Sequence, residues 1–256
     1  MTDLAVVDTG NPAGPPIVWL GSIGSSTAMW VRQLSAFAAD YRCVLVEHPG
    51  HGGTAPPDGP LTIDRIGAAV LAALDGAGIE RAHFVGLSLG AMVSMSIAAR
   101  SPGRVGRLAL LCTSAYFGPD YGWLDRAAKV RGEGMSAVAD ATVGRWLTPD
   151  YAVTHPDEVA SLVEMVMATN PDGYASCCEA IGEMDLRGDL RSVNSRTIVV
   201  AGTQDPATPR PHAETITSLI TDARMETVDA AHLANWEQPG VINELLRAHL
   251  EGANDV

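Results

Sequence analysis

The sequence has 256 residues, of which 46% are hydrophobic and 18% charged, and a chain of this size buries a core without help from disulfides or metal ions. Its formal net charge is −13, which excludes nucleic acid and an anionic membrane as partners, since either needs a basic surface. A small anionic ligand is compatible with this charge only where an arginine or lysine is placed locally at its site.

The four cysteines have neither the spacing of a metal site nor that of a disulfide framework. The N-terminal residues show no basic region and no apolar stretch of signal-peptide length, and every long apolar window is interrupted by glycine or charge. We therefore expect a reduced, cytoplasmic protein that does not span a membrane. The oligomeric state is left open, with a homo-oligomer as one option.

Short apolar runs alternate with helical patterns in the first part of the chain, which is typical of a parallel sheet with crossover helices. Strands are predicted at Pro16–Leu20, Arg42–Glu47, Ala82–Leu87 and Arg107–Cys112. Helices are predicted at Ala28–Ala39, from an N-cap at Thr62 to about Gly78, and at Leu89–Arg100.

The pattern changes at about residue 115. From 115 to 187 there are helical segments rich in Met, Ala and Glu and no convincing strand. Strands resume at Thr197–Ala201 and Met225–Asp229, and a last helix covers Pro239–Leu250. The sequence thus predicts an α/β domain of residues 1–114 and 188–256, with residues 115–187 inserted late in the sheet as a helical cap.

Gly86-Leu87-Ser88-Leu89-Gly90 is a G-x-S-x-G motif, which alone is a weak signal. Its setting is more informative, because a strand is predicted to end and a small-residue helix to begin there, as a nucleophile elbow requires. The alternative is an ordinary strand-to-helix turn with a helix-capping serine. We predict Ser88 as a nucleophile.

A serine hydroxyl needs a base, and the base needs an acid that orients it. In the chain order Ser, Asp, His, these residues should follow the last two strands. Asp205 follows the strand at 197–201, and His232 follows the strand at 225–229. His48 and His51 lie on a glycine-rich loop, where a structural role fits better. We predict His232 as the base and Asp205 as the acid, with a plain turn residue as the alternative for Asp205.

An oxyanion hole requires two backbone N–H groups near the nucleophile. The N–H of Leu89 directly follows Ser88, and Ser22 in Gly21-Ser22-Ile23-Gly24 is the predicted second donor. A plain glycine-rich turn is the alternative. No P-loop, dinucleotide motif or metal-ligand spacing occurs, so neither a cofactor nor a metal is expected.

The chain resembles the 3-oxoadipate enol-lactonases, a family with the α/β-hydrolase fold: a mostly parallel sheet, flanking helices and a cap. The resemblance covers nearly the whole sequence. It is carried by the segments at 21–30, 81–90, 144–149 (Gly144-Arg145-Trp146-Leu147-Thr148-Pro149), 173–178, 202–209 and 229–233. The two cap segments are the more specific ones, because caps vary with substrate.

The resemblance implies hydrolysis of an enol-lactone that bears one free carboxylate, through an acyl-enzyme on Ser88. In so acidic a protein that carboxylate needs a cation, and Arg145, beside Trp146, is the best candidate in the cap. A solvated surface arginine is the alternative. Trp123 is expected either as an apolar wall of the pocket or as a core residue.

Three other functions stay open at this point. They are an esterase or lactonase for another small acyl group, a carbon–carbon bond hydrolase of the same fold, and a ligand-binding protein with no turnover. Asp205 and His232 disfavour the last, because a binder has no need of them together with Ser88.

Overall fold

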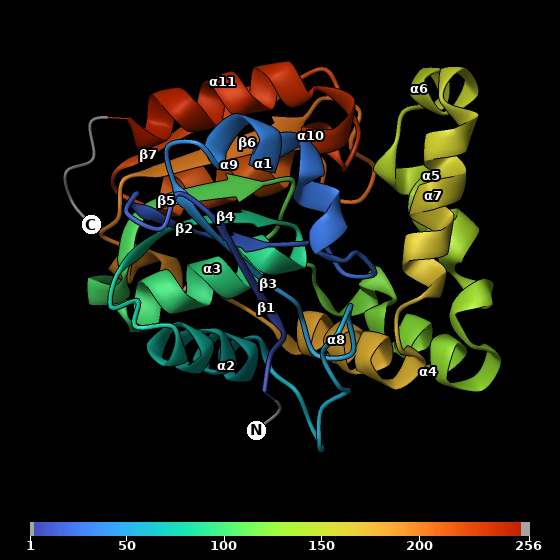
Figure 1. Cartoon of the computed structure of the whole chain (residues 1–256). Coiled ribbons are helices and arrows are strands. Elements are labelled where there is room, and N and C mark those ends of the chain that lie inside the picture. Colours follow the sequence, from blue (N-terminus) through green and yellow to red (C-terminus); the bar gives the residue numbers. More distant parts are fainter. Residues whose placement is uncertain (1–2, 252–256) are drawn as a thin grey trace.

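The computed structural model describes residues 3–251, and its centre is a seven-stranded sheet between two layers of helices (Figure 1). The strand order is β1-β3-β2-β4-β5-β6-β7, and all neighbours are parallel except β1, which runs antiparallel to β3. The strands are β1 (Val6–Gly10), β2 (Pro16–Leu20), β3 (Arg42–Val46), β4 (Ala82–Leu87), β5 (Val105–Leu111), β6 (Thr197–Gly202) and β7 (Ala223–Val228).

The predicted fold class is confirmed, with one strand that the sequence did not reveal. β1 is an edge strand whose five residues are all exposed, so it lacks the apolar alternation by which strands are recognised. By contrast, every residue of β4, β5 and β6 is buried, as expected for central parallel strands covered on both faces.

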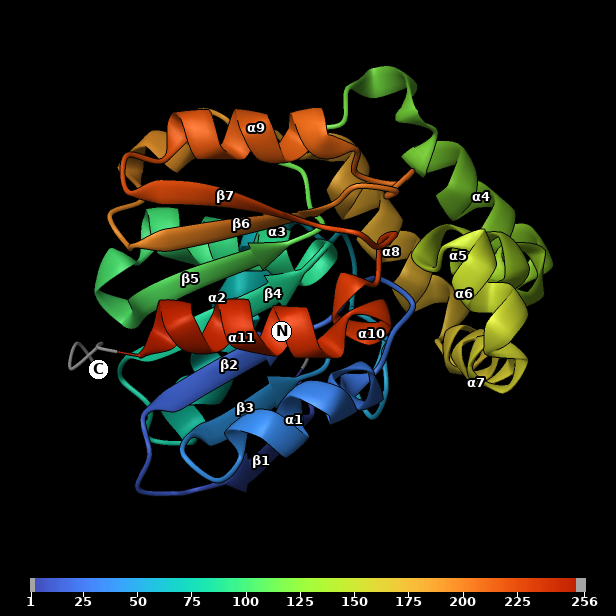
Figure 2. The same cartoon turned by 90° about the horizontal axis from the view of Figure 1, so that it is seen from above.

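Helices α2 (Ile63–Gly76) and α3 (Leu89–Arg100) cover one face of the sheet, and α1 (Val31–Phe37) and α11 (Pro239–Leu250) cover the other (Figures 1 and 2). The Thr62 hydroxyl accepts a hydrogen bond from the Arg65 N–H at 3.1 Å and caps α2, as predicted. The remaining core helices are α9 (Arg210–Leu219), α10 (Ala234–Glu237) and the short 3-10 helices η1 (Thr27–Trp30), η2 (Pro102–Arg104) and η5 (Asp189–Ser192).

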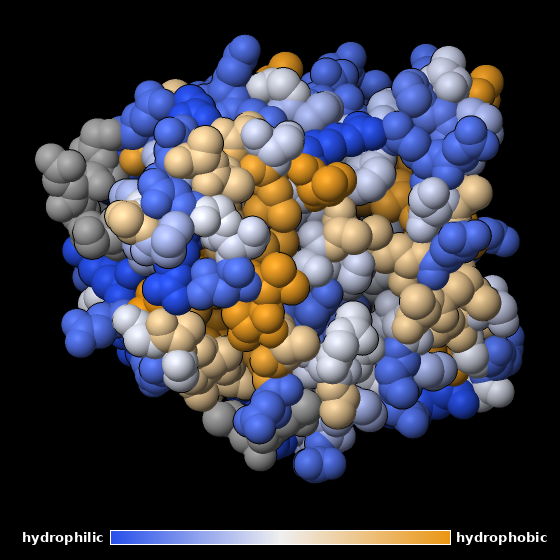
Figure 3. All heavy atoms as spheres, viewed as in Figure 1, coloured by the Kyte–Doolittle hydropathy of each residue, from blue (hydrophilic) through white to orange (hydrophobic). Residues whose placement is uncertain are grey.

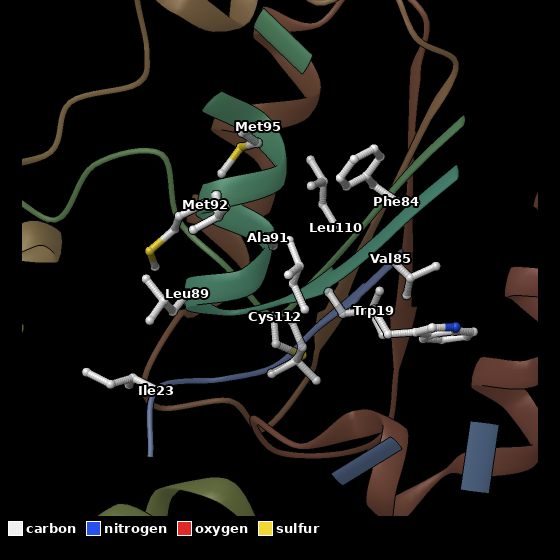
Figure 4. Close-up of a cluster of buried hydrophobic side chains, with 14 of the residues drawn as sticks. Trp19, Ile23, Phe84, Val85, Leu89, Ala91, Met92, Met95, Leu110 and Cys112 are labelled. Carbon is white, nitrogen blue, oxygen red and sulfur yellow. The ribbon is translucent and has the colours of Figure 1, made fainter. Parts of the chain in front are cut away.

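One part of the hydrophobic core lies between α3 and the central strands. Figure 4 shows Leu89, Ala91, Met92 and Met95 along α3, with Ala91 on the side of the helix where Phe84 of the sheet lies, and Leu89 and Met92 projecting from the other side. All five are completely buried. Because burying a side chain such as Met or Phe contributes about 1.5–3 kcal/mol, this packing fixes the start of α3 firmly against the end of β4.

Between β5 and β6, the described residues form helices and no strand. The helices are η3 (Pro119–Tyr121), α4 (Trp123–Glu133), η4 (Met135–Ala137), α5 (Ala139–Trp146), α6 (Pro149–Thr154), α7 (Pro156–Met167) and α8 (Pro171–Glu183). Helices α4 to α7 stand beside the sheet in both ribbon views (Figures 1 and 2). We propose residues 115–187 as the cap on this basis.

The surface on the side seen in Figure 1 is hydrophilic around its rim, with a band of hydrophobic residues near its middle (Figure 3). Over residues 3–251, no helix is long and apolar enough to cross a membrane.

Candidate active site

Ser88 occupies a sharp turn between β4 and α3. Its φ is 55° and its ψ −116°, a conformation that costs energy in any residue with a side chain. The flanking glycines are required by close packing: a Cβ on Gly90 would lie 2.1 Å from the Leu20 carbonyl oxygen, and one on Gly86 would lie 2.5 Å from the Ala91 nitrogen. The G-x-S-x-G motif therefore has the geometry of a nucleophile elbow.

Asp205 and His232 meet behind this turn. The His232 Nδ1 lies 2.8 Å from Asp205 Oδ2, and both residues are buried. The Asp205 carboxylate also accepts hydrogen bonds from the Thr208 hydroxyl at 2.6 Å and from the N–H groups of Ala207 and Thr208. Burial raises the pKa of Asp205, but the charge of His232 and these hydrogen bonds outweigh it and lower the pKa to about 2. Asp205 is thus an ionised, fully hydrogen-bonded partner for the imidazole.

Ser88 and His232 line one small inner cavity of about 30 Å³. The same cavity is lined by the predicted residues Ser22, Trp123, Arg145 and Trp146, and also by Ile23, Phe117, Arg126, Thr142, Ala207 and Thr208. The structure therefore gathers the predicted nucleophile, base and substrate-binding residues around one space. Among the side chains that the structure describes, no group of three or more His, Cys, Asp or Glu is placed to hold a metal ion.

The predicted oxyanion loop forms a tight turn, in which the Ser25 N–H donates to the Ser22 carbonyl at 3.1 Å and Gly24 has a φ of 79°. The Ser22 N–H donates to the Met29 Sδ at 3.3 Å. In the described part of the chain, the N–H of Ile23 has no acceptor, and Ile23 lines the inner cavity. The hydrogen bonding therefore favours Ile23 over Ser22 as the second donor. Leu89 is the first residue of α3, so its N–H has no acceptor within the helix.

Arg126 is a feature of the cavity that the sequence did not predict. Its guanidinium donates to the Tyr174 hydroxyl at 2.8 Å and to the Thr142 hydroxyl at 2.5 Å, and it lies over the rings of Trp123 and Tyr174. Arg145 shares the cavity, and within the described residues neither arginine has a carboxylate partner. Burial, and then the charge of Arg126, lower the pKa of Arg145. An anion bound between these two partly buried cations would reduce their electrostatic repulsion.

The comparisons with known proteins agree with this geometry. Residues 15–239 match the family described as alpha/beta hydrolase fold. The sequence is 32% identical to 3-oxoadipate enol-lactonase 2 of Acinetobacter baylyi, over 96% of this chain and 92% of that protein. The crystal structure of the enol-lactonase from Burkholderia xenovorans LB400 superposes with a TM-score of 0.95 at 35% identity, covering 97% of this chain and 96% of that one. The chain belongs to the α/β-hydrolase superfamily and to its enol-lactonase family. The sequence-based family assignment is thereby confirmed.

Two histidines hold the predicted oxyanion loop of this α/β-hydrolase in place. The Gly24 N–H donates to His51 Nε2 at 2.9 Å, and His48 Nε2 lies 2.9 Å from the Gly21 carbonyl oxygen, to which it donates. Burial lowers the pKa of His48 to about 4; burial and the neighbouring His48 lower the pKa of His51 to about 3. The neutral rings fit these contacts, since His51 Nε2 must be unprotonated to accept. The structural role expected for both residues is consistent with this arrangement.

A carboxylate of this α/β-hydrolase joins the cap to the loop that carries His232. Glu237 Oε1 accepts from the Ala231 N–H at 2.9 Å and from the Thr148 N–H at 3.2 Å, and Oε2 accepts from the Thr148 hydroxyl at 2.7 Å. The Leu233 N–H donates to the Trp146 carbonyl at 2.8 Å. Both neighbours of His232 are therefore tied to the segment 146–148, which no sequence motif revealed.

Proposed function

We propose that this α/β-hydrolase opens 3-oxoadipate enol-lactone to 3-oxoadipate in the β-ketoadipate pathway, through an acyl-enzyme on Ser88. The observation that carries the proposal is the strained Ser88 turn beside the His232–Asp205 pair, in a cavity that also holds two arginines with no carboxylate partner among the described residues. The enol-lactonases among its relatives support the choice of substrate. We place the reaction in the cytoplasm.

In the first half of this reaction, Ser88 Oγ attacks the lactone carbonyl while His232 takes the hydroxyl proton. The ring carbon–oxygen bond then breaks, and the enolate oxygen leaves but stays attached to the acyl group. The enolate takes up the proton from His232, which becomes neutral again and can act as a base in the second half. An enolate is a better leaving group than an alkoxide, so it needs little acid assistance from His232. In the second half, water adds to the acyl-enzyme with His232 as base, and Ser88 recovers its proton as the carboxylate product leaves. No step in this sequence requires a cofactor.

The negative charge on the tetrahedral intermediate would be held by two backbone N–H groups, those of Leu89 and Ile23. Each has no acceptor among the described residues, and Ile23 lines the inner cavity with Ser88. Preorganised donors of this kind typically contribute about 3–4 kcal/mol each to transition-state stabilisation.

The free carboxylate of the substrate would be bound between Arg126 and Arg145. Arg126 is held in place by Tyr174 and Thr142, whereas Arg145 makes no hydrogen bond among the described residues and is free to follow the ligand. Trp123 would form an apolar wall beside them, and Trp146, which is almost completely buried, would support that wall. A carboxylate shared by two guanidinium groups receives charge-assisted hydrogen bonds, the strongest class available in proteins.

The test is hydrolysis of freshly generated lactone, followed by its loss of ultraviolet absorbance. Ser88→Ala should abolish turnover, and Arg145→Ala and Arg126→Ala should each raise KM by about 10- to 100-fold with a smaller effect on kcat. The matched control is Arg191→Gln, because Arg191 is exposed, unpaired in the described residues and outside the cavity.

Brisk hydrolysis of neutral aryl esters with no activity on the lactone would contradict the substrate assignment while leaving the Ser88 chemistry intact. That outcome would favour an esterase or lactonase for another acyl group. Activity on vinylogous diketones but not on esters would instead identify a carbon–carbon bond hydrolase, and binding without any turnover would identify a ligand-binding protein.

A further inference from the structure

Lys129 is the only lysine in the sequence, and it lines a cavity next to the candidate active site. It lines an outer cavity of about 370 Å³ on the cap, together with Arg126, Arg145 and Trp123. These last three residues also line the inner cavity, so the two spaces are neighbours. The remaining lining residues of the outer cavity are Tyr121, Gly122, Asp125, Pro206 and Ala207.

The charge of this outer cavity is opposite to that of the whole protein. Among the described side chains, three cations line it against one carboxylate, Asp125, whereas the sequence has 30 acidic and 17 basic residues. Arginines elsewhere in the described chain commonly have a carboxylate partner, for example Arg42 with Asp8 and Arg131 with Glu179. Among the side chains that the structure describes, those of residues 3–119 and 121–251, no carboxylate lies within ion-pair distance of the three cations of the outer cavity. Unpaired cations collected at one entrance favour a negatively charged ligand there.

The relative sizes of the two cavities indicate how such a ligand would lie. The inner cavity, at about 30 Å³, has room for a reacting carbonyl group next to Ser88 but not for a whole acyl chain. The outer cavity has the volume of an ordinary small-molecule site. Its wall includes the stacked rings of Tyr121 and Trp123, with centroids 6.4 Å apart, which suit methylene groups.

We propose that the outer cavity is a second carboxylate subsite, centred on Lys129, through which the enzyme also hydrolyses open-chain monoesters of longer dicarboxylic acids. The ester carbonyl lies at Ser88, the methylene chain passes Arg126 and Trp123, and the distal carboxylate reaches Lys129. This inference rests on the proposed Ser88 chemistry, but not on the lactone as substrate.

The reaction is the same acyl transfer applied to an open chain. The Ser88 Oγ–acyl bond forms as the bond between the acyl carbon and the alcohol oxygen breaks, and the alcohol leaves with the proton that His232 took from Ser88. Water then cleaves the acyl-enzyme, which releases the dicarboxylate and returns a proton to Ser88.

The kinetic test compares p-nitrophenyl monoesters of the dicarboxylic acids from succinate to suberate with uncharged p-nitrophenyl esters of equal chain length. Lys129→Gln should raise KM for the longest monoesters by about two- to fivefold, the range expected for one exposed ion pair, and leave the uncharged esters unchanged. Asp125→Asn should lower KM for the same monoesters, and Arg191→Gln, a loss of one exposed charge elsewhere, should change nothing. Equal effects of Lys129→Gln and Arg191→Gln, or equal effects on charged and uncharged esters, would overturn the proposal.

A binding test in the Ser88→Ala variant separates the subsite from catalysis. The neutral reagent N-acetoxysuccinimide acetylates Lys129, and peptide mapping follows the modification of this one lysine. Adipate and suberate should slow the acetylation several-fold, while their uncharged dimethyl esters should not. Unchanged acetylation in the presence of saturating suberate would refute the subsite.

The two proposals can fail separately. A Lys129-dependent preference for long monoesters without lactone hydrolysis would contradict the proposed function and support the outer subsite. Lactone hydrolysis, together with monoester KM values that do not change in Lys129→Gln, would support the proposed function and contradict the outer subsite.

Discussion

Glu237 offers the sharpest test of how the proposed cap and the proposed catalytic histidine, His232, are connected. Its carboxylate bonds Ala231 in the histidine loop and Thr148 in the cap segment. Glu237→Ala would remove all three hydrogen bonds and leave the N–H groups of two buried residues, Ala231 and Thr148, without their acceptor. Such groups cost about 1–3 kcal/mol each, and water entering the half-buried site would recover part of this. We expect a loss of about 2–4 kcal/mol in the free energy of unfolding.

The same change should reduce turnover in the protein that remains folded. His232 lies between Ala231 and Leu233, so a shift of the loop moves the imidazole relative to Ser88. A misplacement of about 1 Å costs on the order of 100-fold in rate, and we expect kcat to fall by about 10- to 100-fold. Glu237→Gln keeps an oxygen acceptor for both N–H groups, and its amide can donate to the Thr148 hydroxyl. It should stay within about threefold of the wild-type kcat.

The matched control is Glu158→Ala. Glu158 also joins the cap to the core, because it bonds Arg32 at 2.7 Å and the Trp236 indole N–H at 2.6 Å, but it contacts neither neighbour of His232. It should lower the unfolding temperature without lowering kcat on p-nitrophenyl acetate, a substrate with no carboxylate to be bound. Two outcomes would refute the claim that Glu237 positions His232. One is a wild-type kcat in a Glu237→Ala protein that circular dichroism shows to be folded; the other is an equal loss of kcat in both alanine variants.

Three further predictions follow from the site. Gly90→Ala should prevent soluble expression or abolish esterase activity, because its Cβ would lie 2.1 Å from the Leu20 carbonyl oxygen; wild-type activity would show that the turn adapts. Asp205→Asn should lower kcat by about 10³- to 10⁴-fold in an esterase assay at pH 7. The introduced amide would donate a hydrogen bond to His232 Nδ1, and this favours the wrong tautomer of the imidazole. Burial lowers the pKa of His48 to about 4 and that of His51 to about 3 in the folded protein. As the pH falls below about 6.5, these two histidines therefore become protonated in the unfolded chain but stay neutral in the folded one. The free energy of unfolding, measured with urea, should therefore decline between about pH 6.5 and pH 4 by at most about 1.4 kcal/mol per pH unit for each histidine. The decline should be less steep in His51→Gln, and an equal slope in this variant would contradict the prediction.

The positions of Ser88, Asp205 and His232 could be predicted because each depends on local pattern. β4 and α3 have the predicted bounds, and the motif lies between them. Asp205 and His232 follow β6 and β7, which are parallel neighbours, so their loops emerge at the same edge of the sheet. The strand β1 could not be predicted, because an exposed edge strand carries no apolar alternation.

The parts of the site that sequence reasoning missed depend on contacts between distant segments. Arg126 lies on α4 and Arg145 on α5, and nothing in their spacing indicates that they share a cavity. The choice of Ile23 over Ser22 depends on the sulfur atom of Met29, which takes the Ser22 N–H. One sequence signal could have drawn attention to the outer cavity: a single lysine in a chain with many arginines.

The segment 145–148 connects the proposed substrate site to the loop that carries His232, and this connection constrains how the cap can change. Arg145 faces the cavity where the substrate carboxylate would bind, while the Trp146 carbonyl and Thr148 bond Leu233 and, through Glu237, Ala231. A cap replacement that alters residues 146–148 would disturb the His232 loop as well as the pocket. Asp125 and Lys129, in contrast, line the outer cavity and not the inner one. Substrate preference should therefore be easier to alter at the outer cavity, where KM can change while kcat is kept, than at the 145–148 segment, where both change together.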